Sequence, residues 1–235
     1  MRHLALLGAA ALVAAAVTVP ASPALAAAPL AGAATCADID FVFQPASAFP
    51  DTARGRYDNH MQGSRIEKSV LCLVNAERTS RGLQPVKRYI ALRGTTVALS
   101  SAASKEVAAA VRIRWWGTVA QVGNCTPDKY NPSRCDVHIN PETGTDPADR
   151  AKAAGYCRRG SSWAVGENAY QGWGRASVTP RAAVTWWMGS QRHRDTILTP
   201  GYTEMYAKAA LGSADPSVSA TPAATYVQMF GRCTS

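Results

Sequence analysis

Two histidines and one glutamate are the side chains of this sequence best suited to chemistry. His138, Glu167 and His193 follow one another at intervals of 29 and 26 residues. Two imidazoles and a carboxylate are the ligand set of many zinc sites, in which a fourth position stays open to water or substrate. Without a metal, a carboxylate beside an imidazole can orient it and raise its basicity. Intervals this wide do not by themselves bring the three side chains together.

These residues could also have purely structural roles. Glu167 could simply accept hydrogen bonds from backbone donors and orient a nearby loop, with the histidines bonded beside it. No Gly-x-Ser-x-Gly elbow of a serine hydrolase occurs, although a helical turn could bring Ser190 to His193. A glycosidase needs two positioned carboxylates. The available partners for Glu167 are Asp149 and Asp195, which nothing else in the sequence singles out.

Residues 1–26 have the layout of a secretory signal peptide. A basic start at Arg2 and His3 is followed by an apolar run, and Ala24-Leu25-Ala26 fits the small-residue rule for signal peptidase. The run is short for a membrane anchor, which needs about 20 residues. No later segment is long and apolar enough either. We therefore expect a secreted, extracellular protein with no transmembrane segment in the mature chain.

The mature chain has the size of one domain. Residues 27–63 are rich in Ala, Pro and Gly, which predicts an irregular N-terminal arm, and residues 64–235 form the domain. The six cysteines of the mature chain favour disulfides, since the count is even and the compartment is oxidising. Of fifteen connectivities, the turn-rich loop between Cys125 and Cys135 makes that pair the easiest. For the others we expect Cys36–Cys72 and Cys157–Cys233.

Charge limits the classes of partner. The 25 basic and 16 acidic residues become 24 and 16 when Arg2 is removed with the signal segment, which leaves a net charge of +8. Outside a cell, such a surface attracts anionic envelope polymers, phospholipid headgroups or acidic glycans. The basic residues are scattered and no nucleic-acid motif occurs, so we expect no nucleic-acid partner.

Local signals predict four helices. Ser64 and Glu67 have the spacing of a capping box for a helix that ends at Gly82. Asp146-Pro147 and Thr179-Pro180 each combine a cap with a proline at the first helical position. Another helix is expected over residues 96–113, with a buried side that includes Val97, Ser101, Ser104, Val107, Ala108 and Val111.

Three aromatic or β-branched segments predict strands at 163–170, 202–211 and 225–230, and the last two form a hairpin around the loop 212–222. In the third strand, Tyr226, Gln228 and Phe230 alternate with Val227 and Met229. The mixture of helices and strands lacks regular βαβ units. It predicts an α/β fold, a three-layer α/β/α sandwich around a small mixed or antiparallel sheet.

Six segments in order form a more specific pattern. They are Leu73 to Arg78, Arg81 to Val86, His138 to Gly144, Val165 to Ala169, Trp187 to Arg194, and Tyr226 to Gly231. Together they resemble the bacterial SCP-like form of the CAP superfamily, the cysteine-rich secretory, antigen 5 and pathogenesis-related-1 proteins. The resemblance covers residues 65–231 and implies the CAP fold, stapled by disulfides.

The resemblance also implies a site. His138, Glu167 and His193 would converge in a central cleft beside Asn168, and Ser190 stands where eukaryotic relatives carry a second glutamate. The loop before His138 is longer than is usual in the family. Trp173, between two glycines, is expected to be exposed, where an indole can stack on sugar or lie at a lipid headgroup layer.

CAP relatives are associated with lipid or sterol binding, and some with claimed proteolysis. We therefore expect a non-catalytic extracellular binding domain for a small apolar or anionic ligand, such as a lipid, that uses the His/Glu/His cleft, rather than an enzyme. One alternative is a metal-assisted hydrolase acting on wall peptide or protein, with zinc held by the same three residues. The other is an envelope-associated structural protein that binds anionic polymers.

Overall fold

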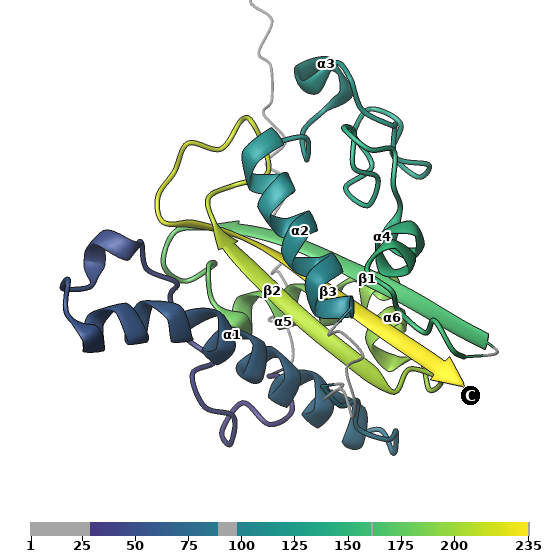
Figure 1. The fold of residues 1–235 in the computed structure, drawn as a ribbon, viewed down its shortest axis with the longest axis horizontal. Helices are drawn as coiled ribbons and strands as arrows, with labels where there is room; N and C mark the ends of the chain where they lie inside the picture. Colours follow the sequence, from purple (N-terminus) through teal and green to yellow (C-terminus); the bar gives the residue numbers. More distant parts are fainter. Residues whose placement is uncertain (1–28, 89–97, 161, 235) are drawn as a thin grey trace, which may run out of the picture.

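A three-stranded antiparallel sheet lies at the centre of the molecule (Figure 1). The computed structural model describes residues 29–88, 98–160 and 162–234. The strands β1 (Ser162–Trp173), β2 (Glu204–Leu211) and β3 (Ala223–Thr234) lie in the order β1-β3-β2, so β1 is an edge strand. All three predicted strands are confirmed, as is the β2–β3 hairpin. The predicted signal peptide lies outside the described residues.

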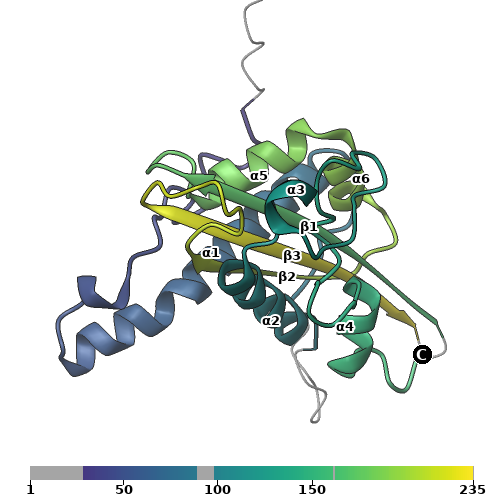
Figure 2. The same cartoon turned by 90° about the horizontal axis from the view of Figure 1, so that it is seen from above.

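Helices cover both faces of the sheet (Figure 2). The helices α1 (Ala53–Thr79), α5 (Pro180–Gly189) and α6 (Gln191–Leu198) pack on one face, and α2 (Ala98–Ile113) and α4 (Pro147–Ala153) pack on the other. Two short elements, the 3-10 helix η1 (Ala46–Ala48) and α3 (Val119–Val122), lie in connections. The architecture is the predicted α/β/α sandwich. No helix in the described ranges has both the length and the apolarity to cross a bilayer.

The sheet separates two hydrophobic cores because successive side chains of a strand point to opposite faces. On β3, Tyr226 and Phe230 belong to the core under α1 and α5, whereas Val227 and Met229 belong to the core under α2. The alternation predicted for this strand is therefore confirmed. Since β3 is the central strand, both of its faces are buried.

Two helix starts are set by local chemistry. The side chain of Asp146 accepts a hydrogen bond from the backbone N–H of Asp149 at 2.8 Å, and Pro147 opens α4. Thr179 likewise accepts from the N–H of Ala182 at 3.1 Å, before Pro180 opens α5. Both predicted caps are confirmed, since each joins residues only three apart.

The predicted start of the first helix is wrong. Helix α1 begins at Ala53, and Thr52 caps it by accepting from the N–H of Gly55 at 3.0 Å. Residues 53–63, assigned above to the irregular arm, are therefore helical. Glu67 does not serve a capping box; it is buried and pairs with Lys208 at 2.7 Å and with Arg88. Glu67, which the local pattern assigns to a helix cap, instead forms an ion pair with residues distant in the sequence.

The predicted buried face of α2 is also partly wrong. Ser104 and Ala108 are exposed, while Leu99, Ala103 and Glu106 are buried. Alanine and serine carry too little hydrophobic contrast to define a helix face, and a glutamate counts against burial. The predicted start at Thr96 and the predicted buried residue Val97 lie outside the described residues.

Three disulfides tie the outer segments to the sandwich. Cys36 pairs with Cys72, Cys125 with Cys135, and Cys157 with Cys233, which are the pairings expected from the sequence. The first attaches the arm to α1 and the third attaches the segment after α4 to the end of β3. The second closes the loop between α3 and α4 on itself, and each bond restricts the unfolded chain.

Arg78 is a buried cation on the α1 side whose guanidinium binds several backbone carbonyls. Its side chain is fully buried and donates to the carbonyls of Gln84 (2.9 Å), Ile197 (2.6 Å), Thr199 (3.0 Å) and Tyr202 (3.3 Å). A single guanidinium thus holds the segment after α6 against α1.

Replacing Arg78 with Ala should lower the free energy of unfolding by about 3 kcal/mol or more, because buried carbonyls lose their donor. Urea denaturation followed by circular dichroism measures this. Arg54→Ala is the control, since that exposed residue contacts Asp58 and Tyr57 on the same helix and its loss should cost about 0.5 kcal/mol or less. Equal effects of the two substitutions would contradict the assignment.

Candidate functional site

Glu167 lies on the edge strand β1 with its carboxylate buried toward the α2/α4 layer. Both oxygens accept hydrogen bonds from Nη2 of Arg150, at 2.9 and 2.8 Å. Oε1 also accepts from Nδ1 of His138 at 2.9 Å, a direction that follows from the ionised carboxylate, which can only accept. The predicted approach of His138 to Glu167 is therefore present, and a guanidinium completes it.

Arg150, on α4, is the centre of this network. Its Nη1 donates to the carbonyls of His138 (3.0 Å) and Thr145 (2.8 Å), so it also holds the loop that carries His138. The same atom lies 3.4 Å from Oε1 of Glu106 on α2. One buried cation therefore joins two buried carboxylates from different elements.

Glu106, like Arg150 and Asn140, is a member of the network that the sequence did not single out. Its Oε2 accepts from Nδ2 of Asn140 at 3.2 Å, and its side chain is buried. Burial raises the pKa of Glu106 to about 7, although the positive charge of Arg150 opposes this; the nearby charge of Glu167 adds to the rise. The available signal was an isolated acid beside Val107 on the apolar side of a predicted helix.

His138 remains accessible, with 31% of its side chain exposed. Burial alone would lower its pKa, but the hydrogen bond to Glu167 and the charge of that carboxylate outweigh burial, so the pKa of His138 is raised. A raised pKa favours the imidazolium. The ring therefore presents a partly exposed edge while its Nδ1–H is committed to Glu167.

His193 has different surroundings. It lies in the first turn of α6, with Nδ1 2.8 Å from the hydroxyl of Ser190 and its ring 4.6 Å from that of Trp186. The backbone carbonyl of His193 accepts from Nδ2 of Asn168 at 3.1 Å. Burial, with the positive charges of His138 and Arg192, lowers the pKa of His193 to about 4. This imidazole is therefore neutral at pH 7.

Of the predicted trio, His138 and Glu167 are joined by a hydrogen bond, and the convergence of all three residues in one cleft stays a prediction. Within the described part of the chain, no hydrogen bond or ion pair connects His193 with His138 or Glu167. The reason is the alternation along β1: Glu167 faces the α2/α4 layer, whereas its neighbour Asn168 faces α6 and holds the His193 backbone. His138 acts on His193 through its positive charge, which opposes protonation of the His193 ring.

Zinc does not fit this arrangement. The ranges described here contain no group of three or more His, Cys, Asp or Glu side chains placed to hold a metal ion. Both Glu167 oxygens already accept from Arg150, whose positive charge would compete with a metal. The zinc site expected from His138, Glu167 and His193 thus has no support in the geometry.

The remaining predicted residues are separate from the network. Ser190 meets His193 as a helical turn allows, but an imidazole with a pKa of about 4 is a weak general base at neutral pH. Trp173, at the end of β1, is 50% exposed. Trp186 is exposed as well, whereas Trp116 is buried.

The structure defines a disulfide-stapled α/β/α sandwich, and the ordered sequence motifs resemble those of SCP-like proteins. No protein-family model and no curated protein matches this chain. Similar solved structures include an extracellular SCP-domain protein from Bacillus anthracis (16% identity, TM-score 0.42, covering 78% of this chain and 44% of that one). Others are an outer surface protein from Borrelia burgdorferi (12%, 0.41, 70% and 90%) and a cysteine-rich secretory protein from Staphylococcus aureus (15%, 0.41, 73% and 39%). The chain thus spans less than half the length of two of these proteins, and its resemblance to the family rests on the sequence motifs.

Glu106 predicts a distinctive pH dependence of stability. The pKa of Glu106 in the folded protein, about 7, lies above the ordinary value of 4.5. Its contribution to the free energy of unfolding is therefore fully present below pH 4.5 and is lost as pH rises through 7. The free energy of unfolding of the wild type relative to Glu106→Gln should fall by about 3 kcal/mol between pH 4.5 and 8. Urea denaturation at both pH values measures it.

Glu142→Gln is the matched control. Glu142 is exposed and pairs with Arg112, and this hydrogen bond lowers the pKa of Glu142. Any pH dependence from Glu142 therefore has the opposite sign, because its contribution is lost as pH falls. A difference between wild type and Glu106→Gln that stays constant from pH 4.5 to 8 would refute the role given to Glu106.

The His138–Glu167 contact can be tested directly. Glu167→Gln removes the charge that raises the pKa of His138, so burial then dominates and this pKa should fall below 6.5. An NMR titration of the imidazole C–H resonances measures the change, with His60 on α1 as internal reference. An unchanged His138 titration would show that the two side chains do not interact.

Proposed function

We propose that this chain is a secreted, non-catalytic binding protein for a small apolar or anionic ligand. The observation that supports this best is the state of Glu167. Its carboxylate is buried and all of its hydrogen bonds go to Arg150 and His138. A general base or a metal ligand needs a free lone pair that faces the substrate. Glu167 is therefore a positioning residue that holds His138 and the loop around it.

The hydrolase alternative lacks an activated group in the same region. His193 has a pKa of about 4 and touches Ser190 and Trp186 instead of a carboxylate. A triad requires an acid that orients the base and stabilises its charged form. The surface that includes His138 and His193 is better suited to contact a ligand than to transform one.

Secretion is supported by two independent features. The signal-peptide pattern of residues 1–26 predicts export. The three disulfides among the described residues belong to an oxidising compartment. A protein working outside the cell meets lipids, wall fragments and acidic polymers, which are the ligand classes that its positive charge favours.

The charge also favours a second candidate, a structural protein that docks on anionic envelope polymers. Such docking would depend on many scattered arginines and lysines, and it would weaken steeply with salt. A small ligand held in a hollow would instead survive a high-salt wash. The two functions therefore separate in one purification.

The decisive measurement is native mass spectrometry of the secreted protein, purified through a high-salt wash and then extracted with organic solvent. We expect one small apolar or anionic molecule per chain, and elemental analysis should find no stoichiometric zinc. A secreted protein of another fold, carried through the same steps, is the control. An extract identical to that of the control would refute the binding function. Stoichiometric zinc that is lost in His138→Ala would establish the metal site that the hydrolase alternative requires.

A further inference from the structure

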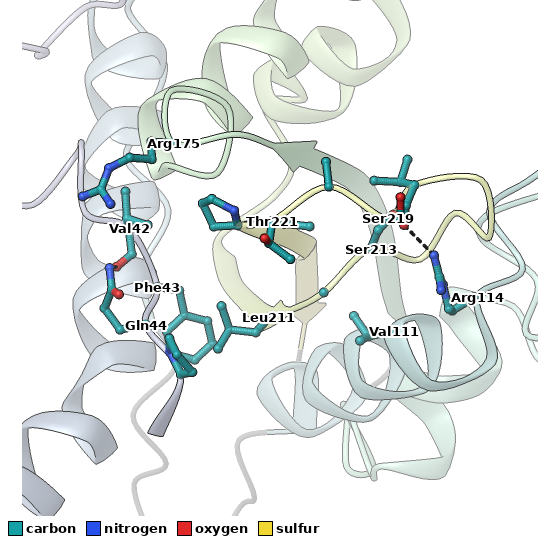
Figure 3. A pocket seen from close by; sticks show the side chains of 16 residues that line it. Val42, Phe43, Gln44, Val111, Arg114, Arg175, Leu211, Ser213, Ser219 and Thr221 are labelled. Atoms are coloured by element: carbon teal, nitrogen blue, oxygen red, sulfur yellow. Dashed lines mark hydrogen bonds between the residues drawn. The ribbon is translucent and has the colours of Figure 1, made fainter. Parts of the chain in front are cut away.

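A hollow of about 820 Å³ lies between the N-terminal arm, the loop after β1 and helix α5. Asp40 and Val42 line it from the arm, Arg175 from the loop, and Thr185 and Trp186 from the helix. Figure 3 shows the neighbouring hollow, which Val42 and Arg175 also line, and there Arg175 extends from the loop toward the arm. Among the described residues, the lining contains no histidine and no glutamate. Its size falls in the usual range for small-molecule sites.

The apolar part of this hollow is the indole of Trp186, which is 48% exposed. Its ring centroid lies 5.6 Å from that of Tyr170 and 4.6 Å from that of His193, so neighbouring rings hold the indole in place. Ala182 and Thr185 lie one helical turn before it on the same face of α5 and add only small side chains. Covering exposed indole is favourable by about 25 cal/mol per Å². Trp186 therefore offers a fixed aromatic platform to a ligand with an apolar face.

An ion pair supplies the polar part of the same hollow and fixes the arm to α5. Nε and Nη2 of Arg181 donate to the two carboxylate oxygens of Asp40, at 2.6 and 2.7 Å. The backbone N–H of Arg181 also donates to the carbonyl of Ile39 at 2.8 Å. Both charged side chains remain exposed, and each uses only part of its hydrogen-bonding capacity in the pair. Acceptors of Asp40 and donors of Arg181 are thus left side by side, which suits the hydroxyl groups of a ligand.

The hollow keeps one uncompensated positive charge. Asp40 and Arg181 neutralise each other. Arg175 is exposed, and in the described ranges no hydrogen bond or ion pair uses its guanidinium. A free guanidinium matches a carboxylate with two parallel hydrogen bonds. The charge in the lining therefore favours a ligand that carries a single negative charge.

We propose that this hollow binds an acidic pyranose, a sugar ring with one carboxylate, with its C–H face on Trp186, its hydroxyls on Asp40 and Arg181, and its carboxylate on Arg175. The C–H groups of a pyranose pack on the electron-rich face of an indole, while its hydroxyls point outward from the ring edge. An ion pair beside the indole meets those hydroxyls, which an unbranched apolar ligand would lack. The proposal rests on the binding function above, and it names one anionic ligand class and its place.

NMR titration of the mature protein with methyl glucuronide and with methyl glucoside tests the role of Arg175. The two sugars differ only in the group at C6, which is a carboxylate in the first and a hydroxymethyl group in the second. The wild type should bind the glucuronide about tenfold more tightly, the gain expected for a charge-assisted hydrogen bond, and the indole N–H resonance of Trp186 should shift. Arg175→Gln should reduce glucuronide affinity to that of the glucoside. Arg159→Gln is the matched control, because Arg159 is exposed and lies outside the hollow, and it should keep the preference.

Trp186→Ala tests the platform and should abolish binding of both sugars. Tyr57→Ala also removes an exposed ring, but one outside the hollow, and should bind both normally. Ala176→Trp is a second test that leaves the packing of Trp186 intact, because Ala176 is an exposed loop residue in the lining and the new indole should fill the hollow. It should lose both sugars while its thermal midpoint is retained. No shift with either sugar, equal affinities in the wild type, or glucuronide binding unchanged in Arg175→Gln or Ala176→Trp would overturn the proposal.

The outcome is also separable from the function proposed above. If an endogenous ligand copurifies with the wild type and with Ala176→Trp, and the glucuronide does not bind, this site is refuted and the binding function stands. If the glucuronide binds as described but nothing copurifies, the site stands and the tightly retained ligand is refuted. If no ligand copurifies and neither sugar binds, both proposals fail.

Discussion

The arrangement of this site depends on the ion pairs that the guanidinium of Arg150 makes with Glu167 and Glu106. Buried carboxylates are unfavourable unless a cation and hydrogen bonds compensate them. Arg150 serves Glu167 on β1 and Glu106 on α2, and it binds the carbonyl of His138 with the same side chain. One residue of α4 thereby fixes the distance between three other segments. A substitution at Arg150 would disturb all of them together.

This network gives the conspicuous acid and the two histidines different surroundings. The acid that could activate an imidazole is neutralised by a buried cation, and it lies on the opposite side of the edge strand from His193. Different surroundings shift the two imidazole pKa values in opposite directions, since the carboxylate of Glu167 raises that of His138 whereas burial lowers that of His193.

Local patterns predicted those parts of the fold that local forces determine. The caps at Asp146 and Thr179 and the two faces of β3 all follow from residues within a few positions of one another. The start of α1 did not follow, because Glu67 matches a capping pattern but is used in an ion pair with Lys208. Short-range rules cannot distinguish these uses, since the partner is 141 positions away.

By itself, the sequence determined the order and type of the main elements, the α/β/α class and the residues able to do chemistry. Only the tertiary structure decided which of those residues meet. Glu167 and Asn168 are neighbours in sequence, yet the pleat of β1 sends one to Arg150 and the other to the backbone of His193. The position of Glu106 beside the same cation depends on how α2 and α4 pack, a relation that no spacing along the chain encodes.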